Sequence, residues 1–324
     1  TLYRPITSEI EIRRGNPVQL QNYRNAHHLH DVRRNVVYCY IAKNACSTFK
    51  YHFLRQVPEV GDVLPTDQIN ADLHKLVRQY SLAHLSVDDW ENKYVFAIIR
   101  HPFQRVASAF LDKFVRHADL PRYARELMKH ARSDNDPNNW TFSDFVSAIA
   151  AAPVDALNEH WMPQYVHMFD DVQYDLVPIE SMSANPSLVE LYGDVSENIR
   201  EHSLEYSDVD GPAHKLTVRE LRRMREEDGV VPSWRALAQS ETVDRLMGVY
   251  KSDFALYEHA RNAAAGPTKW SEMQRDATNI VAFRRADPYM NGVDKSRSAE
   301  DELISVILPV YNVEPYIREC MDSL

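Results

Sequence analysis

The chain has 324 residues, which is enough for one large or two moderate domains with a buried core. No apolar run is long enough for a membrane-spanning helix, so the sequence predicts none. The net charge of -10 argues against broad contact with nucleic acid, which needs a basic surface, but it leaves room for a small anion pocket. Three cysteines are too few for a disulfide framework, fit no zinc ribbon and suggest a reducing compartment.

Glycine is scarce, with only 8 residues in the chain. None of them forms a G-x-G-x-x-G or G-x-x-x-x-G-K-[ST] pattern, so the usual glycine-rich loops for dinucleotides and nucleoside triphosphates are absent. Any phosphate site in this chain must be built in another way.

Two apolar runs, each followed by a helical pattern, predict the centre of a sheet. Residues 1–34 are polar without a clear period, and we take them as an N-terminal extension. Residues 35–42 predict a buried strand, followed by a helix from Thr48 that Pro58 ends. Residues 94–99 predict a second strand that leads directly into a helix. Strands that run straight into helices favour a parallel α/β sheet.

The second half of the chain is mostly helical by pattern. Residues 118–160 predict polar helices with a loop at 133–139, and residues 172–179 predict another strand. Amphipathic helices are expected over 183–260. We take 261–302 as a linker, after which 303–324 begins with a new apolar strand.

The first strand-to-helix turn carries groups that bind anions. A helix N-terminus offers unpaired backbone N–H groups and the positive end of a dipole. Lys43 adds a cation just before this helix, and Ser47 and Thr48 add hydroxyl donors. The alternative is that Ser47 only caps the helix and that Lys43 is a solvated loop residue.

The second turn repeats the pattern. Arg100 ends a buried strand, at the sheet edge where parallel sheets bind ligands, and Ser108 lies two helical turns further on. A planar guanidinium suits a phosphate, although an arginine here can also pair with a carboxylate. Two such turns in one α/β unit predict a ligand with two separate phosphate groups.

Four blocks of this sequence resemble a known family. KNACSTFK (43–50) resembles the 5′-phosphosulfate-binding loop of the membrane-type carbohydrate sulfotransferases, and RHPFQRVASAFLDKF (100–114) resembles their 3′-phosphate motif. NEHW (158–161) and YDLVPIESM (174–182) are similar to two further blocks of the chondroitin and HNK-1 sulfotransferase branch, in the same order. The resemblance covers 35–260, which we take as a sulfotransferase domain.

The resemblance implies transfer of a sulfuryl group from 3′-phosphoadenosine 5′-phosphosulfate to a hydroxyl of a glycan or polysaccharide, without a metal ion. It implies a P-loop-kinase-like parallel sheet flanked by helices, with additional helices in the C-terminal half. Departures are His101 in place of an acidic residue and Phe49 in place of Trp. The cysteines that lumenal animal relatives carry near 168–172 are missing, which favours a cytoplasmic, bacterial version.

The same resemblance assigns roles to the two turns. Arg100 and Ser108 are expected to hold the 3′-phosphate of the donor. Lys43 is expected to stabilise the moving sulfuryl group and the leaving phosphate. The backbone N–H groups expected to share that work are those of Asn44, Ala45, Cys46, Ser47 and Thr48.

The acceptor hydroxyl needs a general base, for which three residues compete. His160 is favoured because it stands in the NEHW block. His84 is the main rival, since a histidine upstream of the second phosphate motif does this work in heparan-type relatives. Glu159 is the third candidate.

The C-terminal segment resembles a different family. Residues 304–324 (ISVILPVYNVEPYIRECMDSL) are similar to the first strand and helix of the family-2 inverting glycosyltransferases, so 303–324 is expected to be the truncated start of such a domain. Two alternatives to the sulfotransferase stay open. One is a P-loop-like kinase, and the other is a non-catalytic nucleotide-binding module fused to a glycosyltransferase.

Overall fold

The computed structural model describes residues 2–3, 17–57, 71–83, 90, 93–116, 120–131, 136–195, 205–207 and 213–264, with strands 2–3 and 205–207 and a few helix-end residues described by backbone only. The chain divides into two units, 1–281 and 282–324, and every described residue lies in the first. His84, the greater part of the predicted linker and the glycosyltransferase-like segment 303–324 lie outside the described residues.

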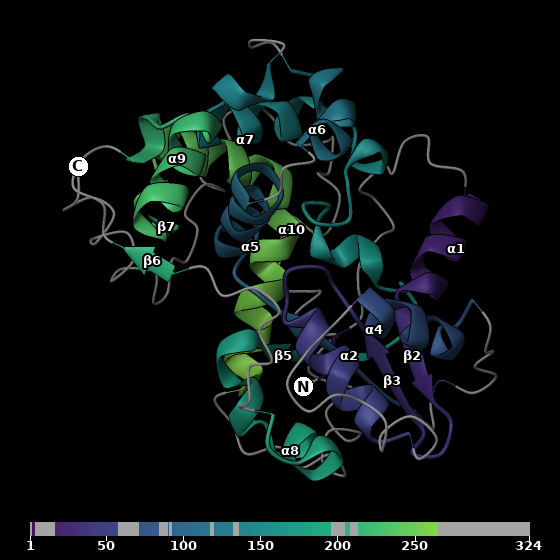
Figure 1. The fold of residues 1–324 in the computed structure, drawn as a ribbon. Coiled ribbons are helices and arrows are strands. Elements are labelled where there is room, and N and C mark those ends of the chain that lie inside the picture. The colour runs from purple at the N-terminus through teal and green to yellow at the C-terminus, as the bar shows by residue number, and fades with distance from the viewer. Residues whose placement is uncertain are drawn as a thin grey trace. The chain divides into compact units, whose positions relative to one another are not determined.

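A five-stranded sheet forms the centre of the first unit (Figure 1). Its strands are β1 (Leu2–Tyr3), β2 (His28–Asp31), β3 (Val36–Cys39), β4 (Tyr94–Ile99) and β5 (Tyr174–Pro178), in the spatial order β1-β5-β4-β3-β2. The three central strands are parallel, and both outer strands pair antiparallel to their neighbours. The predicted α/β class is therefore confirmed, but the sheet is parallel only at its centre, since both outer strands are antiparallel.

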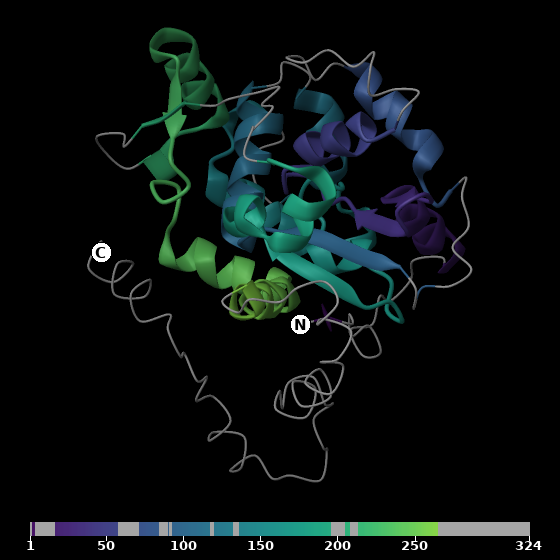
Figure 2. The same cartoon turned by 90° about the horizontal axis from the view of Figure 1, so that it is seen from below.

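The central strands are buried on both faces, which explains why β3 and β4 are uninterrupted apolar runs and why β5 carries only one charged residue, Asp175. Alternate side chains point to opposite faces, so Val36 and Tyr38 join one core cluster and Val37 and Cys39 join another. The first cluster is covered by α2 (Cys46–Arg55) and α8 (Pro186–Tyr192). The second is covered by α10 (Ser240–Ala264), which Figure 2 shows along the opposite face of the sheet.

Each predicted strand-to-helix connection is present. β3 leads into α2, and β4 leads into α5 (Pro102–Phe110), which begins with a proline at its first position. α5 continues into a π-helical turn, η2 (Leu111–Arg116). Such turns are rare and often mark functional sites. Both helices thus begin at the carboxyl ends of parallel strands, at the same edge of the sheet.

A third core cluster is built mainly from helices. It joins α5 to α6 (Leu120–Met128), α7 (Phe142–Ala151), α9 (Val218–Asp228) and part of α10. The short two-stranded parallel sheet of β6 (Glu205–Ser207) and β7 (Val230–Pro232) lies in the region where the sequence pattern predicts helices alone, so that prediction is wrong there. Strands of three residues are too short to show a period of two.

The N-terminal residues, predicted to be without a clear period, contain helix α1 (Pro17–Ala26) and strand β2. The remaining helix on the β2 side is α4 (Ala71–Leu76). The short 3₁₀ turns are η1 (Val77–Tyr80), η3 (Pro137–Asn139), η4 (Val154–Ala156), η5 (Gln164–His167), η6 (Ile179–Ala184) and η7 (Ala213–Lys215). No helix in the described part of the chain is both long enough and apolar enough to cross a membrane.

Candidate active site

The loop between β3 and α2 is tightly curled although it contains no glycine. Lys43 and Ala45 both have positive φ, at 70° and 54°. Each left-handed residue of this kind costs of order 1 to 3 kcal/mol, and such strain collects at functional sites. Ala45 is the N-cap of α2 and has no side-chain acceptor, so Ser47 is not the cap.

Lys43 belongs to a charge cluster centred on Asp112. Its Nζ lies 3.1 Å from Asp112 Oδ2, which also receives Lys113 Nζ at 2.9 Å, while Arg116 Nη1 lies 2.9 Å from Oδ1. Burial raises the pKa of Asp112, but Lys43 and Lys113 outweigh it and hold that pKa well below its usual range. Burial lowers the pKa of Lys43, and Asp112 partly restores it.

The second turn reaches the first one. Arg100 Nη1 donates to the backbone carbonyl of Lys43 at 3.1 Å, so the two predicted anion-binding turns lie in contact. Ser108 follows on α5 with its side chain partly exposed. The structure therefore brings Lys43 and Arg100 together, as the two-phosphate hypothesis requires.

Gln164 is fully buried and forms hydrogen bonds with both turns, the one at Asn44 and the one at Arg100. Its Oε1 accepts from Arg100 N at 3.0 Å and from Asn44 Nδ2 at 2.6 Å, and its Nε2 donates to the Arg100 carbonyl at 2.9 Å. Asn44 Nδ2 also donates to Ile98 O of β4 at 2.8 Å. The backbone N–H of Gln164 is held in turn by Asp253 Oδ2 of α10 at 2.7 Å, and burial raises the pKa of Asp253 to about 6.

Arg105 makes a second connection. It lies on α5, is fully buried and donates to three backbone carbonyls, those of Ala42, Glu159 and Met162, at 2.9, 2.9 and 2.7 Å. The first carbonyl immediately precedes Lys43, and the second immediately precedes His160.

His160 is oriented by Asn158. The backbone N–H of His160 donates to Asn158 Oδ1 at 3.1 Å, which fixes this atom as the amide oxygen, and the His160 Nδ1–H donates to the same oxygen. Nε2 of His160 is then left as the proton acceptor of the ring. Burial, followed by the positive charge of Lys113, lowers the pKa of His160 to about 3. Lys43 acts in the same direction, so His160 lies within electrostatic range of the Lys43 loop.

The carboxylate of Glu159 forms a hydrogen bond with His27. Its Oε2 accepts from His27 Nε2 at 3.0 Å, and this hydrogen bond lowers the pKa of Glu159 to about 2. Its carboxylate is therefore a weaker base than an ordinary glutamate. Of the three candidates for the base, His160 is the one oriented with a ring nitrogen open, whereas His84 lies outside the described residues.

Sequence reasoning missed four residues that build the site: Arg105, Asp112, Gln164 and Asp253. A signal was available for the first two, because both lie inside the block that resembles the 3′-phosphate motif. Gln164 and Asp253 carry no local sequence signal, because their hydrogen bonds join residues that lie 64 to 120 positions apart along the chain.

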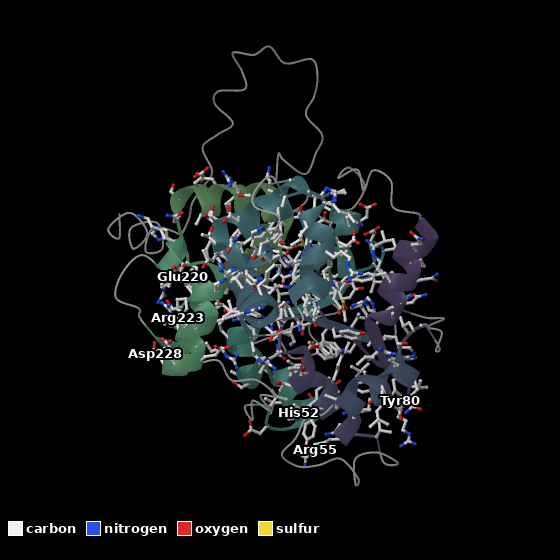
Figure 3. The ribbon with its side chains drawn as sticks, turned by 45° about the horizontal axis from the view of Figure 1, so that its top comes forward. His52, Arg55, Tyr80, Glu220, Arg223 and Asp228 are labelled. Atoms are coloured by element: carbon white, nitrogen blue, oxygen red, sulfur yellow. The ribbon has the colours of Figure 1, made fainter. Side chains whose placement is uncertain are left out.

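Two other features lie apart from this site. A cavity of about 370 Å³ is lined by His52, Arg55, Gln56, Tyr192 and Asp194. His52 and Arg55, both labelled in Figure 3, lie in the last turn of α2, at the end of the helix opposite to the Lys43 loop. In the part of the chain that the structure describes, no group of three His, Cys, Asp or Glu side chains is arranged to hold a metal ion.

Comparison with known proteins agrees with this geometry. The model of the family described as "Sulfotransferase family" matches residues 27–260. Carbohydrate sulfotransferase 14 of Homo sapiens is 28% identical over 156 residues, which are 45% of this chain and 40% of that protein. Carbohydrate sulfotransferase 11 of Mus musculus is 23% identical over 250 residues, which are 71% of this chain and 66% of that protein.

The match to carbohydrate sulfotransferase 14 thus spans less than half the length of that relative. No solved structure matches the chain. The family model covers well over half of the chain and includes both predicted anion-binding turns and the His160 segment. The chain therefore belongs to the sulfotransferase family.

Proposed function

We propose that this protein is a carbohydrate O-sulfotransferase, which moves a sulfuryl group from 3′-phosphoadenosine 5′-phosphosulfate to a hydroxyl of a glycan or polysaccharide. The observation that carries the proposal is the contact between the two turns, where Arg100 Nη1 bonds to the carbonyl of Lys43 at 3.1 Å. One ligand with two phosphate groups can therefore engage both turns at once. The names of the relatives support a carbohydrate acceptor.

In this proposal the first turn handles the reacting end of the donor. The N–H groups at the start of α2 and the ammonium of Lys43 face the charge that develops on the sulfuryl oxygens and on the leaving phosphate. Arg100 and Ser108 hold the 3′-phosphate and so fix the position of the donor. We assign no metal ion to the reaction, as the family resemblance implies.

His160 is proposed as the general base. Its Nδ1–H is held by Asn158, so Nε2 is the atom that takes the proton of the acceptor hydroxyl. Burial is the main cause of the low pKa of His160, and the positive charges of Lys113 and Lys43 lower it further; an anionic donor neutralises these two charges. Donor binding should therefore raise the pKa of His160 and make it a better base when the donor is present.

Three further parts of the proposal are supported by the sequence alone. These are the P-loop-kinase-like topology, the cytoplasmic location that missing disulfide cysteines favour, and a downstream glycosyltransferase-like segment. Neither the kinase nor the non-catalytic module is favoured by the family match.

A transfer assay tests the function. The purified chain is incubated with donor labelled in its sulfuryl group and with a panel of unsulfated polysaccharides, and label in the glycan is measured. Transfer to at least one glycan is expected, whereas donor binding without transfer to any glycan would favour the non-catalytic module. Phosphoryl transfer from a nucleoside triphosphate in the same panel would favour the kinase.

Two further measurements test the roles of the turns. Lys43→Ala should lower kcat roughly 10²- to 10³-fold with a much smaller effect on donor affinity, because its charge acts on the transition state. Lys129→Ala, at an exposed lysine paired with Glu126, is the control. Calorimetry should show that 3′-phosphoadenosine 5′-phosphate binds more tightly than adenosine 5′-phosphate, and equal affinities would contradict the assignment of Arg100 and Ser108.

A further inference from the structure

Arg105 is a charged side chain with no exposed surface, and its three hydrogen bonds to Ala42, Glu159 and Met162 all go to backbone carbonyls. A cation is expensive to bury, and an apolar residue of similar size often serves packing equally well. Burial lowers the pKa of Arg105, and Asp253 partly restores it. The contribution of the Arg105 guanidinium is therefore the position of the three backbone carbonyls to which it donates.

A guanidinium is a rigid plane with donors at set angles, so the acceptors around it are held at set distances from one another. Here the plane joins two separate segments of chain. Nε holds the carbonyl of Ala42 in the β3–α2 loop, and Nη1 and Nη2 hold the carbonyls of Met162 and Glu159. A lysine in its place has a single nitrogen and cannot reproduce this planar spacing.

The held carbonyls are next to the reacting groups. Ala42 directly precedes Lys43, and Glu159 directly precedes His160. Consecutive Cα atoms are about 3.8 Å apart, so little free chain separates each carbonyl from the residue that it positions. We propose that Arg105 is a positioning residue that sets the distance between the donor-side Lys43 and the acceptor-side His160.

This inference deepens the proposed function and rests on it. Sulfuryl transfer needs the acceptor oxygen, the sulfur and the leaving oxygen in line, and a misplacement of about 1 Å can lower the rate about 10²-fold. The hydrogen bonds of Arg105 go to backbone carbonyls and not to the side chains of Lys43, Arg100 or Ser108. Its replacement should therefore affect the alignment of the two halves of the site more than the affinity for the donor.

Arg24 provides a matched control. It is also a buried arginine, 5% exposed, and its Nε donates to the carbonyl of Val166 at 3.1 Å, while its two Nη atoms lie 3.3 Å from the carboxylate of Asp170. Both arginines thus secure the same stretch of chain, but Arg24 does not reach the Lys43 loop. A loss of stability alone should affect both variants in the same way.

The test compares Arg105→Lys with Arg24→Lys in the full chain, at a temperature at which both are folded by circular dichroism. Arg105→Lys should lower kcat roughly 10- to 100-fold, while the affinity for 3′-phosphoadenosine 5′-phosphate changes less than about threefold. Arg24→Lys should keep kcat within about threefold of the wild type. Equal losses of kcat in both variants, or no loss in Arg105→Lys, would overturn the inference.

A double-mutant cycle separates positioning from general damage. If Arg105 acts by placing His160, Arg105→Lys should lower kcat much less in a His160→Ala background than in the wild type. Fully additive losses would overturn the inference. If Arg105→Lys does not fold, Arg105→Gln, which keeps N–H donors, carries the same comparison.

The wild type distinguishes this inference from the proposed function. If the wild type transfers no sulfuryl group, the proposed function fails and takes the inference with it. If the wild type is active and Arg105→Lys matches it, only the role of Arg105 fails.

Discussion

The carboxylate of Asp112 forms ion pairs with three cations, so removing its charge should perturb the electrostatics of the site strongly. Its side chain is 7% exposed and lies within 3.1 Å of Lys43 Nζ, Lys113 Nζ and Arg116 Nη1. Asp112→Asn keeps the shape and removes the charge. The three cations then lie close together, largely shielded from solvent, without a carboxylate between them.

The expected loss of stability is large. An ion pair about 4 Å apart is worth roughly 4 kcal/mol at an effective dielectric constant near 20, before desolvation is counted. Removing one partner of a buried pair costs about 3 to 5 kcal/mol in measured cases. For a domain of this size each kcal/mol lowers Tm by about 2 to 4 °C, so Asp112→Asn should lower Tm by about 10 °C.

The pH dependence has a definite sign. The folded-state pKa of Asp112 is depressed, because Lys43 and Lys113 outweigh the effect of burial. The carboxylate therefore contributes stability that is present above its unfolded pKa and is lost as the pH falls through its folded pKa. The difference in Tm between wild type and Asp112→Asn should be full at neutral pH and should shrink in strong acid.

The same substitution changes the charge state of Lys43. Burial lowers the pKa of Lys43 and Asp112 raises it, so removing the carboxylate lowers that pKa further. In the proposed mechanism Lys43 acts in its protonated form on the leaving phosphate. The alkaline limb of the kcat profile should therefore move to lower pH in Asp112→Asn.

Thermal unfolding at several pH values and a pH profile of kcat measure these effects. Glu126→Gln is the control, because Glu126 pairs with Lys129 on the surface, with side chains 56% and 59% exposed, and such pairs are worth at most about 1 kcal/mol. If Asp112→Asn keeps the wild-type Tm and the wild-type alkaline limb, the charge cluster does not control Lys43.

Four other predictions concern the β3–α2 loop, Gln164 and the proposed base His160. Ala45→Gly should leave Tm unchanged or raise it by a few degrees, because glycine relieves the left-handed strain at φ 54°; a clear fall in Tm would contradict the assigned strain. Gln164→Glu removes the N–H that Arg100 O accepts, so calorimetry should show weaker binding of 3′-phosphoadenosine 5′-phosphate, and unchanged affinity would count against it. Since the pKa of His160 is lowered to about 3, kcat/KM should show no acidic limb near pH 6.5, while the limb of kcat, which reports the donor complex, should lie at higher pH. Asn158→Leu should lower kcat about 10-fold or more by releasing the ring, and full activity would exclude that orienting role.

The central strands were predictable because their surroundings are uniform. Both faces of β4 are covered, so all six of its residues are buried and apolar, and the predicted range 94–99 is confirmed. Strand β2 shows the opposite case. Its sequence HLHD looks polar, yet His28 is fully buried, because its Nδ1–H donates to the Arg24 carbonyl and the hydroxyl of Tyr174 donates to its Nε2. Burial lowers the pKa of His28 to about 3, so a neutral histidine serves here as a core residue.

The predicted site residues and the residues that support them differ in the same way. The positions of Lys43 and Arg100 in the chain could be read from local sequence, because Arg100 directly follows β4 and Lys43 lies four residues after the last residue of β3. Gln164 and Asp253 were not, because their roles come from contacts between distant segments, at separations of 64 and 89 residues. The local sequence pattern does not indicate which glutamine will lie between the two loops in the folded protein.

These supporting residues explain how the tightly turned loop between β3 and α2 is stable without glycine. Two left-handed residues, Lys43 and Ala45, together cost several kcal/mol. The ion pair of Lys43 with Asp112 offsets part of this cost, and hydrogen bonds of the neighbouring residues Asn44 and Ala42 offset more. Asn44 is tied to Gln164 and to the carbonyl of Ile98, and the carbonyl of Ala42 is tied to Arg105. A loop held so firmly before ligand binds has little left to reorganise when charge develops on the moving group, which is the condition under which fixed donors stabilise a transition state most.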